Sequence, residues 1–290
     1  MAAKPNLFII GAQKSGTTSL YDRLSSHPSI FLSDPKEPGF FVPEATYYPS
    51  DEAWYLGLFE GGSGHRYRGE ASTHYTKLPL YRGVPERIAA FVDEEPRFIY
   101  LMRDPIERTI SHYWHNVRKL EEHLPLEEAL RERVEYLAFS DYRTQLEAYF
   151  DVFGRDPVLA LAFEDLVTAP DETVAGILGW LELDPSPAEA SLERRNARPR
   201  SFLRLRGSGV LDRIARSEAW GRVSRFIPQP LKDAAKKLAY RSAEPDDEQP
   251  REVVEDLRSR MAEQALELEA FLGTRFPRWT TTFPERAGGA

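Results

Sequence analysis

The feature that most constrains this chain lies near its amino terminus, where a short apolar run passes through a glycine-containing loop into a helix-like segment. Residues 6–10 read Asn-Leu-Phe-Ile-Ile, which is typical of a short buried strand, and residues 17–24 place apolar side chains at helical spacing. Residues 11–16 between them begin and end with glycine. A loop of this kind directs backbone N–H groups and the positive end of a helix at one point. The sequence therefore predicts an anion-binding loop at the edge of a sheet.

The alternation of strands and helices continues along most of the chain. Three further strands are predicted, at residues 67–71, 97–102 and 158–163. Helical spacing predicts helices at residues 85–93, 105–120, 126–137, 141–150 and 251–272, and a helical pattern follows the last strand as far as residue 181. Residues 29–66 are rich in proline, glycine and aromatic residues and predict a long loop with short helices. Alternating strands and helices indicate a P-loop-like, three-layer α/β fold with a central parallel β-sheet flanked by helices.

We predict one domain over residues 1–290, because no stretch has the character of a linker. Residues 5–182 are expected to form a nucleotide-binding α/β core. Residues 183–290 are expected to supply an arginine-rich loop and carboxyl-terminal helices that close over the nucleotide and acceptor cleft. The arginine-rich loop is marked by ten arginines and three acidic residues between positions 190 and 225.

Composition excludes several classes of protein. The 290 residues include no cysteine, which excludes disulfide scaffolds, thiolate zinc sites, iron–sulfur clusters and cysteine nucleophiles. The net charge of −8 argues against general nucleic-acid binding. No apolar run approaches the roughly 18–20 residues of a membrane span, and the run before Gly11 is too short for a signal peptide. We therefore expect a cytoplasmic protein without a membrane span and without nucleic acid as a partner.

The glycine loop resembles the loop of nucleoside-triphosphate enzymes in one respect and differs in another. Gly11 and Gly16 have the spacing of Gly-x4-Gly-Lys-Ser/Thr, but position 17 is threonine, and the lysine of this loop is Lys14. The strand that ends at Met102 is followed by Arg103, a cation, where an acidic residue would help to hold magnesium. This combination favours a phosphate-bearing donor bound without metal. A plain turn between a strand and a helix is the alternative interpretation.

Six segments in order resemble the sulfotransferases that use 3′-phosphoadenosine 5′-phosphosulfate (PAPS), above all the branch of heparan sulfate N- and 3-O-sulfotransferases and their bacterial relatives. Residues 11–20 resemble the family's 5′-phosphosulfate loop, and residues 35–41 its Lys-Glu-Pro-x-Phe-Phe segment. Residues 69–75 resemble its glutamate-containing catalytic segment, and residues 103–113 its 3′-phosphate site. Residues 163–166 and the late segment 272–279 also fit.

The resemblance implies which residues bind the nucleotide. The loop residues Gln13, Lys14, Ser15, Gly16, Thr17, Thr18 and Ser19 would hold the 5′-phosphosulfate. Arg103 and Ser111 would approach the 3′-phosphate from a strand end and from the following helix, since eight residues are a little over two turns at about 3.6 residues per turn. Arg198 and Arg200 lie where the family closes a loop over the nucleotide, although the disulfide of the vertebrate enzymes is missing here. Arg108 is expected either at this site or in a surface ion pair.

Sulfuryl transfer is an in-line displacement that needs cations at the leaving group and, for a hydroxyl acceptor, a base. Lys14 is placed in the loop to neutralise the leaving oxygen, and the resemblance makes Lys36 a second cation. The resemblance assigns the base to Glu70. His74 is the competing candidate, because an ordinary histidine pKa of about 6.5 suits base catalysis near neutrality. His112 and His115 have the spacing of a metal pair but lack further ligands nearby in the sequence, so no metal site is predicted.

The expected function is transfer of a sulfuryl group from PAPS to a hydroxyl, or alternatively to an amine, with release of adenosine 3′,5′-bisphosphate. A P-loop small-molecule kinase and a catalytically inactive nucleotide-binding or scaffold protein are the alternatives. The acceptor stays open among carbohydrates, lipids, polyketides, phenols and other small molecules, and so does the oligomeric state. The remaining arginines of the 190–225 stretch either attract an anionic acceptor or form a solvated surface.

Overall fold

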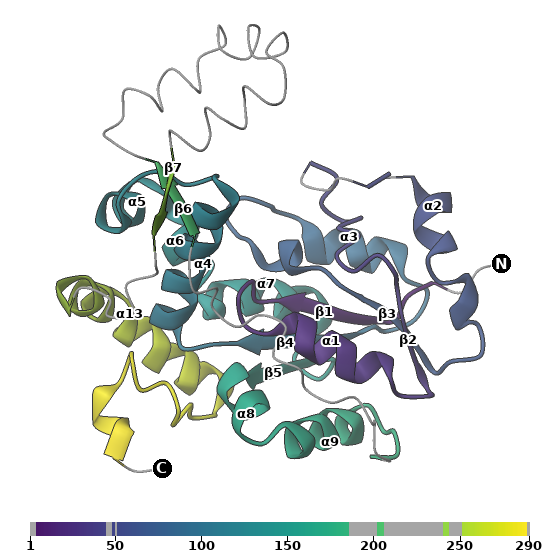
Figure 1. The fold of residues 1–290 in the computed structure, drawn as a ribbon. Helices are drawn as coiled ribbons and strands as arrows, with labels where there is room; N and C mark the ends of the chain where they lie inside the picture. The colour runs from purple at the N-terminus through teal and green to yellow at the C-terminus, as the bar shows by residue number, and fades with distance from the viewer. Residues whose placement is uncertain are drawn as a thin grey trace, which may run out of the picture.

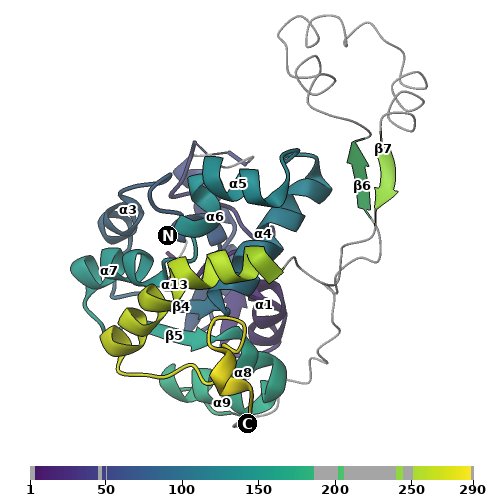
Figure 2. The same ribbon diagram turned by 90° about the vertical axis from the view of Figure 1, so that its left-hand side faces the viewer.

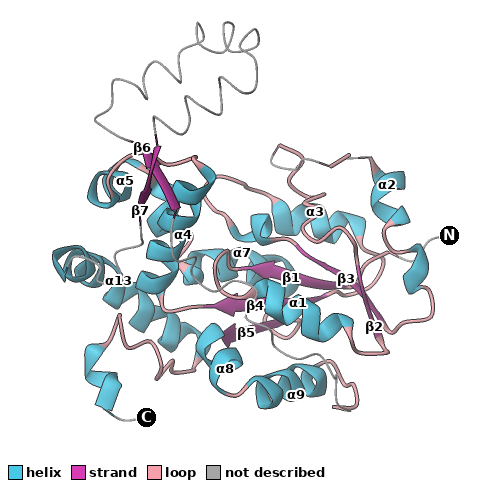
Figure 3. Cartoon of the chain, viewed as in Figure 1, coloured by secondary structure: helices cyan, strands magenta, loops and turns pink. Residues whose placement is uncertain are grey.

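A five-stranded, all-parallel sheet forms the centre of the computed structural model, which describes residues 4–44, 48–49, 51–185, 202–205, 240–243 and 251–288 (Figures 1 and 3). The strand order is β2-β3-β1-β4-β5. The strands are β1 (Leu7–Gly11), β2 (Ile30–Leu32), β3 (Tyr67–Ala71), β4 (Arg97–Met102) and β5 (Val158–Ala162). All residues of β1 are buried, as expected for a central strand covered on both faces. The predicted parallel sheet and its four strands are confirmed.

Helices cover both faces of the sheet and give the three predicted layers. Alternate side chains of β1 point to opposite faces: Leu7 and Ile9 belong to one apolar core, Phe8 and Ile10 to another. The first core is completed by α1 (Thr17–Ser25), α8 (Phe163–Thr168) and α9 (Pro170–Trp180). The second is completed by α3 (Val84–Phe91), α7 (Tyr142–Phe153) and α13 (Arg251–Leu272). Figure 2 shows α3 and α7 on one side of β4 and β5 and α1 on the other.

A third apolar cluster extends the molecule beyond the sheet. It joins α4 (Pro105–Lys119), α5 (Leu126–Glu132) and α6 (Val134–Ala138) to the first half of α13. The remaining short elements are α2 (Glu52–Gly57), η1 (Glu60–Gly62), η2 (Thr73–Thr76), η4 (Pro284–Gly288) and the antiparallel pair β6 (Phe202–Leu205) and β7 (Tyr240–Ala243). The helix α4 begins where the sequence predicts, with Asp104 as its N-cap and Pro105 in its first turn.

The sequence prediction differs from the structure in two places. The stretch 29–66 contains a strand, β2, besides the expected short helices; it has three residues and lies at the sheet edge, paired with β3. The predicted helix 126–137 is two helices, because Arg133 has extended backbone angles. The single domain with boundaries at 5–182 and 183–290 stays a prediction, since most of residues 186–250 lie outside the described part. Among the described residues, no helix is both long and apolar enough to cross a bilayer.

The topology brings the predicted site residues to one edge of the sheet. Successive strands lie on opposite sides of β1, with β3 on one side and β4 on the other. In parallel α/β sheets, ligands bind outside the carboxyl ends of the strands at such a reversal. The glycine loop follows β1, Ser72 follows β3, Arg103 follows β4 and Phe163 follows β5. These segments therefore gather at one edge although up to 150 residues separate them in the sequence.

The segment of residues 276–283, near the carboxyl-terminal end of the described chain, packs back onto this part of the sheet. Trp279 is fully buried, stacks on Phe276 with ring centroids 4.2 Å apart, and donates its indole N–H to Glu164 Oε2 at 3.1 Å. The segment thereby completes the core that contains α7 and α13.

We expect Trp279→Ala to lower the free energy of unfolding by about 3–5 kcal/mol, because it leaves a large cavity and an unpaired carboxylate oxygen. Urea unfolding measures the change. Leu266→Ala on α13 is the control: Leu266 is 52% exposed, and the expected change is within about 0.5 kcal/mol. A loss below 1 kcal/mol for Trp279→Ala would show that the segment does not contribute to the core.

Candidate functional site

The loop between β1 and α1 has a shape that only glycine at position 16 permits. Gly16 is the N-cap of α1 with φ 84°, a left-handed conformation. A Cβ added there would lie 2.5 Å from Cδ2 of Phe163. The loop is tied to the neighbouring strand by the N–H of Ala12, which donates to the carbonyl of Leu101 at 2.7 Å. The loop and the ring of Phe163 are therefore in direct contact.

Two polar side chains of the loop are buried without a hydrogen-bond partner, namely Ser15 through Oγ and Gln13 through Oε1. A buried polar atom without a partner costs about 1–3 kcal/mol, and most such atoms in folded proteins find one. Thr17 is buried in the first turn of α1, and Thr18 and Ser19 are half-buried. The loop thus offers polar groups whose partners a bound phosphosulfate would supply, and the residues present fit the implied nucleotide.

Lys14 stands in the middle of the loop with φ 75°. Burial, followed by the charges of Arg118, Arg103 and Lys119, lowers its pKa to about 8, while Glu37 opposes the shift. At neutral pH the ammonium is still mostly charged. A lysine surrounded by other cations is costly, and a bound anion would remove that cost.

Arg103 lies beside the loop, at the carboxyl end of β4. Its guanidinium carbon is 5.3 Å from the centre of the Phe163 ring, the same ring that contacts Gly16. Its Nη2 donates to Glu107 Oε2 at 3.0 Å. Ser111 is half-buried on α4, two turns beyond. The loop and Arg103 therefore both lie against the ring of Phe163.

Lys36 and His74 meet at a carboxylate that the sequence analysis did not assign, that of Glu37. Lys36 Nζ donates to Glu37 Oε1 at 2.9 Å, Thr73 Oγ1 donates to Oε2 at 3.0 Å, and His74 Nδ1 is 3.8 Å from Oε2. Burial acts to raise the pKa of Glu37, but Lys36, His74 and Thr73 bring it below its ordinary value. Glu37 is therefore an anion near the loop lysine. Its negative charge acts to raise the pKa of Lys14.

Glu70 is fully buried on β3 and surrounded by hydroxyl groups. Tyr55 and Tyr75 donate to Oε1, the latter at 2.7 Å, and Ser72 donates to Oε2. Burial raises the pKa of Glu70 to about 7, while these hydrogen bonds act to lower it. The carboxylate is held in place and titrates near neutrality, but it has no exposed surface in the described structure.

His74 differs from Glu70 in being partly exposed and in having a lowered pKa. Its side chain is 26% exposed. Burial and the charge of Lys77 lower its pKa to about 4, against the attraction of Glu37. The ring is neutral at pH 7 and is a weaker base than an ordinary histidine.

Arg108 is neither a surface residue nor a partner of an acid, so the expected surface ion pair is wrong. Its guanidinium is fully buried and donates to Ser140 Oγ, to the carbonyl of Tyr136 and, at 3.4 Å, to Thr109 Oγ1. Burial lowers its pKa to about 10. These partners all stand on α4 or near the end of α6, so Arg108 joins those two elements.

Sequence reasoning missed three groups at this site besides Glu37. Lys77 is almost fully buried, and burial lowers its pKa to about 8. Arg118 and Lys119 form a basic pair at the end of α4 whose charges reach Lys14. The two basic residues are adjacent in the sequence, but only the placement of α4 in the fold brings their charges near Lys14.

Of the other residues that the sequence analysis named, two lie outside the described residues and two belong to no metal-binding cluster. Arg198 and Arg200 lie outside the described residues. Burial lowers the pKa of both His112 and His115, and His115 is 3.5 Å from Arg118 Nη2. Within the described parts of the chain, no three His, Cys, Asp or Glu side chains come together as a metal site requires.

Comparison with known proteins gives a consistent result along most of the chain. Residues 4–227 match the family model described as "Sulfotransferase domain". The solved structure of a sulfotransferase from Alicyclobacillus acidocaldarius has 26% sequence identity and a TM-score of 0.69, covering 96% of this chain and 99% of that one. The five-stranded parallel sheet and its flanking helices thus match a known sulfotransferase structure.

Two curated relatives are longer proteins. The membrane-associated sulfotransferase kil1 of Dictyostelium discoideum is 33% identical over 119 residues, which is 40% of this chain and 24% of that protein. Heparan sulfate glucosamine 3-O-sulfotransferase 3B1 of Mus musculus is 29% identical over 192 residues, 62% of this chain and 46% of that protein. The matched segments span less than half of the length of these relatives.

We expect Gly16→Ala to lower the free energy of unfolding by about 2 kcal/mol, because alanine is strained at φ 84° and its Cβ would collide with the Phe163 ring. Urea unfolding checks this. The control is Gly176→Ala in α9, where a Cβ meets nothing within 4 Å; there we expect stabilisation of up to about 1 kcal/mol. Equal effects at the two positions would contradict the close contact between the loop and Phe163.

Proposed function

This chain belongs to the family of sulfotransferase domains, and we propose that it transfers a sulfuryl group from PAPS to a hydroxyl acceptor. Adenosine 3′,5′-bisphosphate is the product released. The observation that carries the proposal is that Phe163 touches both the loop at Gly16 and the guanidinium of Arg103. One site thus has a phosphate loop on one side and a second cationic group beside it, as a nucleotide with phosphates at both its 5′ and 3′ ends requires.

The proposed nucleotide contacts follow from this arrangement. The N–H groups of residues 13–19, with the Ser15 hydroxyl and the Lys14 ammonium, bind the 5′-phosphosulfate. Arg103 binds the 3′-phosphate through its planar fork, and Ser111 supplies a hydroxyl from α4. Arg198 and Arg200 belong to the proposal by resemblance alone.

PAPS, when bound, supplies the sulfuryl group and an adenosine bisphosphate leaving group. The bond between sulfur and the bridging phosphate oxygen breaks while a bond forms to the acceptor oxygen, and the acceptor proton passes to a base. Lys14 stabilises the charge that grows on the leaving oxygen. Lys36 is held by Glu37 at 2.9 Å, which fixes a second ammonium next to the same site.

Glu70 is the proposed base. Its pKa of about 7 leaves a substantial fraction as carboxylate at neutral pH and makes that carboxylate a stronger base than an ordinary glutamate. The hydroxyls of Tyr55, Tyr75 and Ser72 hold both oxygens in fixed positions, and an acceptor hydroxyl has to displace one of them. His74 and Glu37 are the alternatives, since both are partly exposed near Lys14.

A sugar hydroxyl is the acceptor that the similarity favours. The 29% identity to a glucosamine 3-O-sulfotransferase supports a carbohydrate, and an amine of such a sugar is the alternative. The cations Arg118 and Lys119, whose charges act on Lys14, suit an acceptor that itself carries negative charge.

A magnesium-dependent small-molecule kinase is the second candidate. Against it stand Arg103 at the end of β4, where an acidic residue would help to hold magnesium, and a lysine inside the loop rather than after Gly16. A catalytically inactive nucleotide-binding protein is the third. Lys14, Lys36 and a glutamate titrating near neutrality speak for chemistry rather than binding alone.

The function is tested by calorimetric titration with adenosine 3′,5′-bisphosphate, AMP and ATP, each in the absence and in the presence of magnesium. We expect the bisphosphate to bind at least tenfold more tightly than AMP, because AMP lacks the 3′-phosphate that Arg103 and Ser111 would bind. Magnesium-dependent ATP binding without bisphosphate binding would favour the kinase instead.

Lys14→Ala extends this test. It should weaken bisphosphate binding at least tenfold, whereas Lys4→Ala should leave binding unchanged. Lys4 is a partly exposed lysine paired with Asp93 at the other end of β1, so it is a matched control. Equal effects of the two substitutions would remove Lys14 from the site.

The role of Glu70 is tested by a pH profile. For a base with a pKa of about 7, kcat/KM should rise as the pH rises through 7, since only the carboxylate accepts a proton, and fall again above about pH 8, where Lys14 loses its charge. Glu70→Gln should abolish turnover while bisphosphate affinity stays within a few-fold. If turnover persists in Glu70→Gln, the base is His74 or Glu37, and the matching substitutions His74→Asn and Glu37→Gln decide between them.

A further inference from the structure

We propose that Glu107, held by Thr281 of the carboxyl-terminal segment, is a positioning residue that orients Arg103 and thereby sets selectivity for a 3′-phosphorylated nucleotide. The inference rests on the proposed function, because it concerns the same nucleotide site. It adds a residue of α4 and a segment beyond the region that matches the family model, which ends at residue 227.

Arg103 is restrained on three sides. Glu107 Oε2 accepts from its Nη2 at 3.0 Å, one helical turn along α4. The ring of Phe163 lies against its guanidinium. The hydroxyl of Tyr142 donates to the backbone carbonyl of Arg103 at 2.7 Å, which fixes the end of β4. A guanidinium carries five N–H donors, and Glu107 takes up one of them, so several are available to a phosphate.

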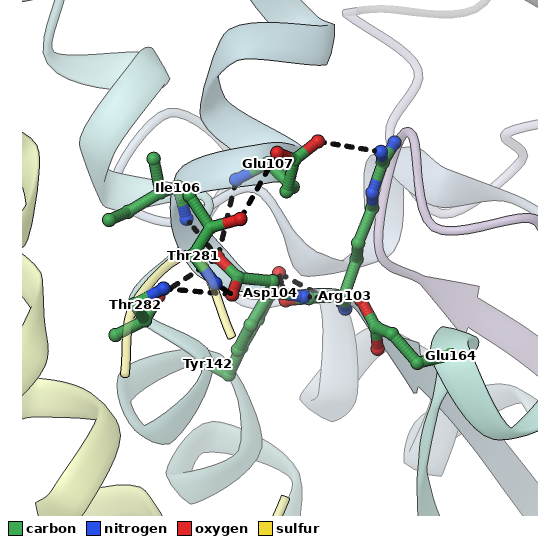
Figure 4. Close-up of polar contacts among 8 residues, drawn as sticks. All are labelled: Arg103, Asp104, Ile106, Glu107, Tyr142, Glu164, Thr281 and Thr282. Atoms are coloured by element: carbon green, nitrogen blue, oxygen red, sulfur yellow. Dashed lines mark hydrogen bonds and ion pairs between the residues drawn. The ribbon is translucent and has the colours of Figure 1, made fainter. Parts of the chain in front are cut away.

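The other oxygen of Glu107 is held from the far end of the chain, as Figure 4 shows. Thr281 Oγ1 donates to Glu107 Oε1 at 3.2 Å. The backbone N–H groups of Thr281 and Thr282 both donate to Asp104 Oδ2 at 3.0 Å, and Thr282 Oγ1 donates to Asp104 Oδ1 at 2.9 Å. The carboxylate that orients Arg103 therefore has its own orientation set by residues 174 positions away.

This segment is itself anchored on two elements. Arg258 of α13 donates through Nε and Nη2 to the carbonyl of Thr281, at 3.2 and 3.0 Å. Trp279 donates to Glu164 Oε2, and Glu164 Oε1 accepts the N–H of Asp104 at 2.9 Å. The path from α13 to Arg103 consists of direct contacts, and each member is buried or half-buried.

The expected consequence is preorganisation. A free arginine side chain loses rotamer freedom when a ligand fixes it. An arginine already held by Glu107 and Phe163 loses less on binding, so affinity for the 3′-phosphate is higher. The Glu107 carboxylate also repels the negatively charged phosphate, and this repulsion acts against the gain in affinity. Substitution of Glu107 therefore measures which of the two effects is larger.

The experiment is titration of adenosine 3′,5′-bisphosphate and of AMP into wild type, Glu107→Ala, Thr281→Val and the double variant. The readout is the ratio of the two dissociation constants, which isolates the 3′-phosphate. We expect Glu107→Ala to reduce the preference for the bisphosphate about tenfold with AMP binding unchanged. Thr281→Val keeps both backbone hydrogen bonds and should reduce the preference two- to threefold, with no further loss in the double variant.

Glu147→Ala is the matched control, because it removes a carboxylate from an exposed Arg–Glu pair of the same spacing on α7. Its ratio should equal that of wild type. A preference in Glu107→Ala that is unchanged or increased would overturn the positioning role, as would equal weakening for both nucleotides. A wild type without any preference for the bisphosphate would contradict the proposed function itself and with it this inference.

Discussion

The buried carboxylate of Asp104 holds together three parts of the chain on which the site depends. It caps α4 by accepting from the N–H groups of Ile106 and Glu107, and it receives both N–H groups of the Thr281–Thr282 pair (Figure 4). Burial raises its pKa, against these hydrogen bonds. A carboxylate buried in this way is stable only while its donors stay in place. The end of β4, the start of α4 and the carboxyl-terminal segment are thus fixed relative to one another.

The site beside this carboxylate is unusual in its balance of charge. Burial and the positive charges of Arg118, Arg103 and Lys119 together lower the pKa of Lys14. These three cations lie near Lys14 although the chain as a whole carries a net charge of −8. Such a concentration is costly in the free protein and is offset when an anion binds. Such a balance of charge suits the doubly phosphorylated nucleotide that the proposed function requires.

Two glutamates near the loop, Glu37 and Glu70, have pKa values that are shifted in opposite directions. Glu37 is paired with Lys36 and has a lowered pKa, so it is an anion that fixes neighbouring side chains. Glu70 is fully buried among hydroxyls and has a raised pKa, so it can exchange a proton near neutrality. The partners make this difference, because desolvation outweighs the hydrogen bonds from neutral hydroxyls at Glu70, whereas contact with charged Lys36 outweighs desolvation at Glu37.

The sequence by itself determined the parallel sheet and the order of four of its strands along the chain, because apolar runs and glycine loops are local signals. It also determined which strand ends carry Lys14, Glu70 and Arg103, since residues that follow parallel strands meet at one edge. It did not show β2, whose three residues depend on pairing with β3, nor the break at Arg133.

Only the tertiary structure decided the surroundings of these residues. It buried Arg108 between α4 and α6, enclosed Glu70 in hydroxyls from α2 and the segment after β3, and brought Thr281 to Glu107. The contacts of Tyr55 with Glu70, of Arg108 with Ser140 and of Thr281 with Glu107 join residues between 15 and 174 positions apart, so no local pattern records them. Their pKa values and orientations follow from burial and packing, which are properties of the whole fold.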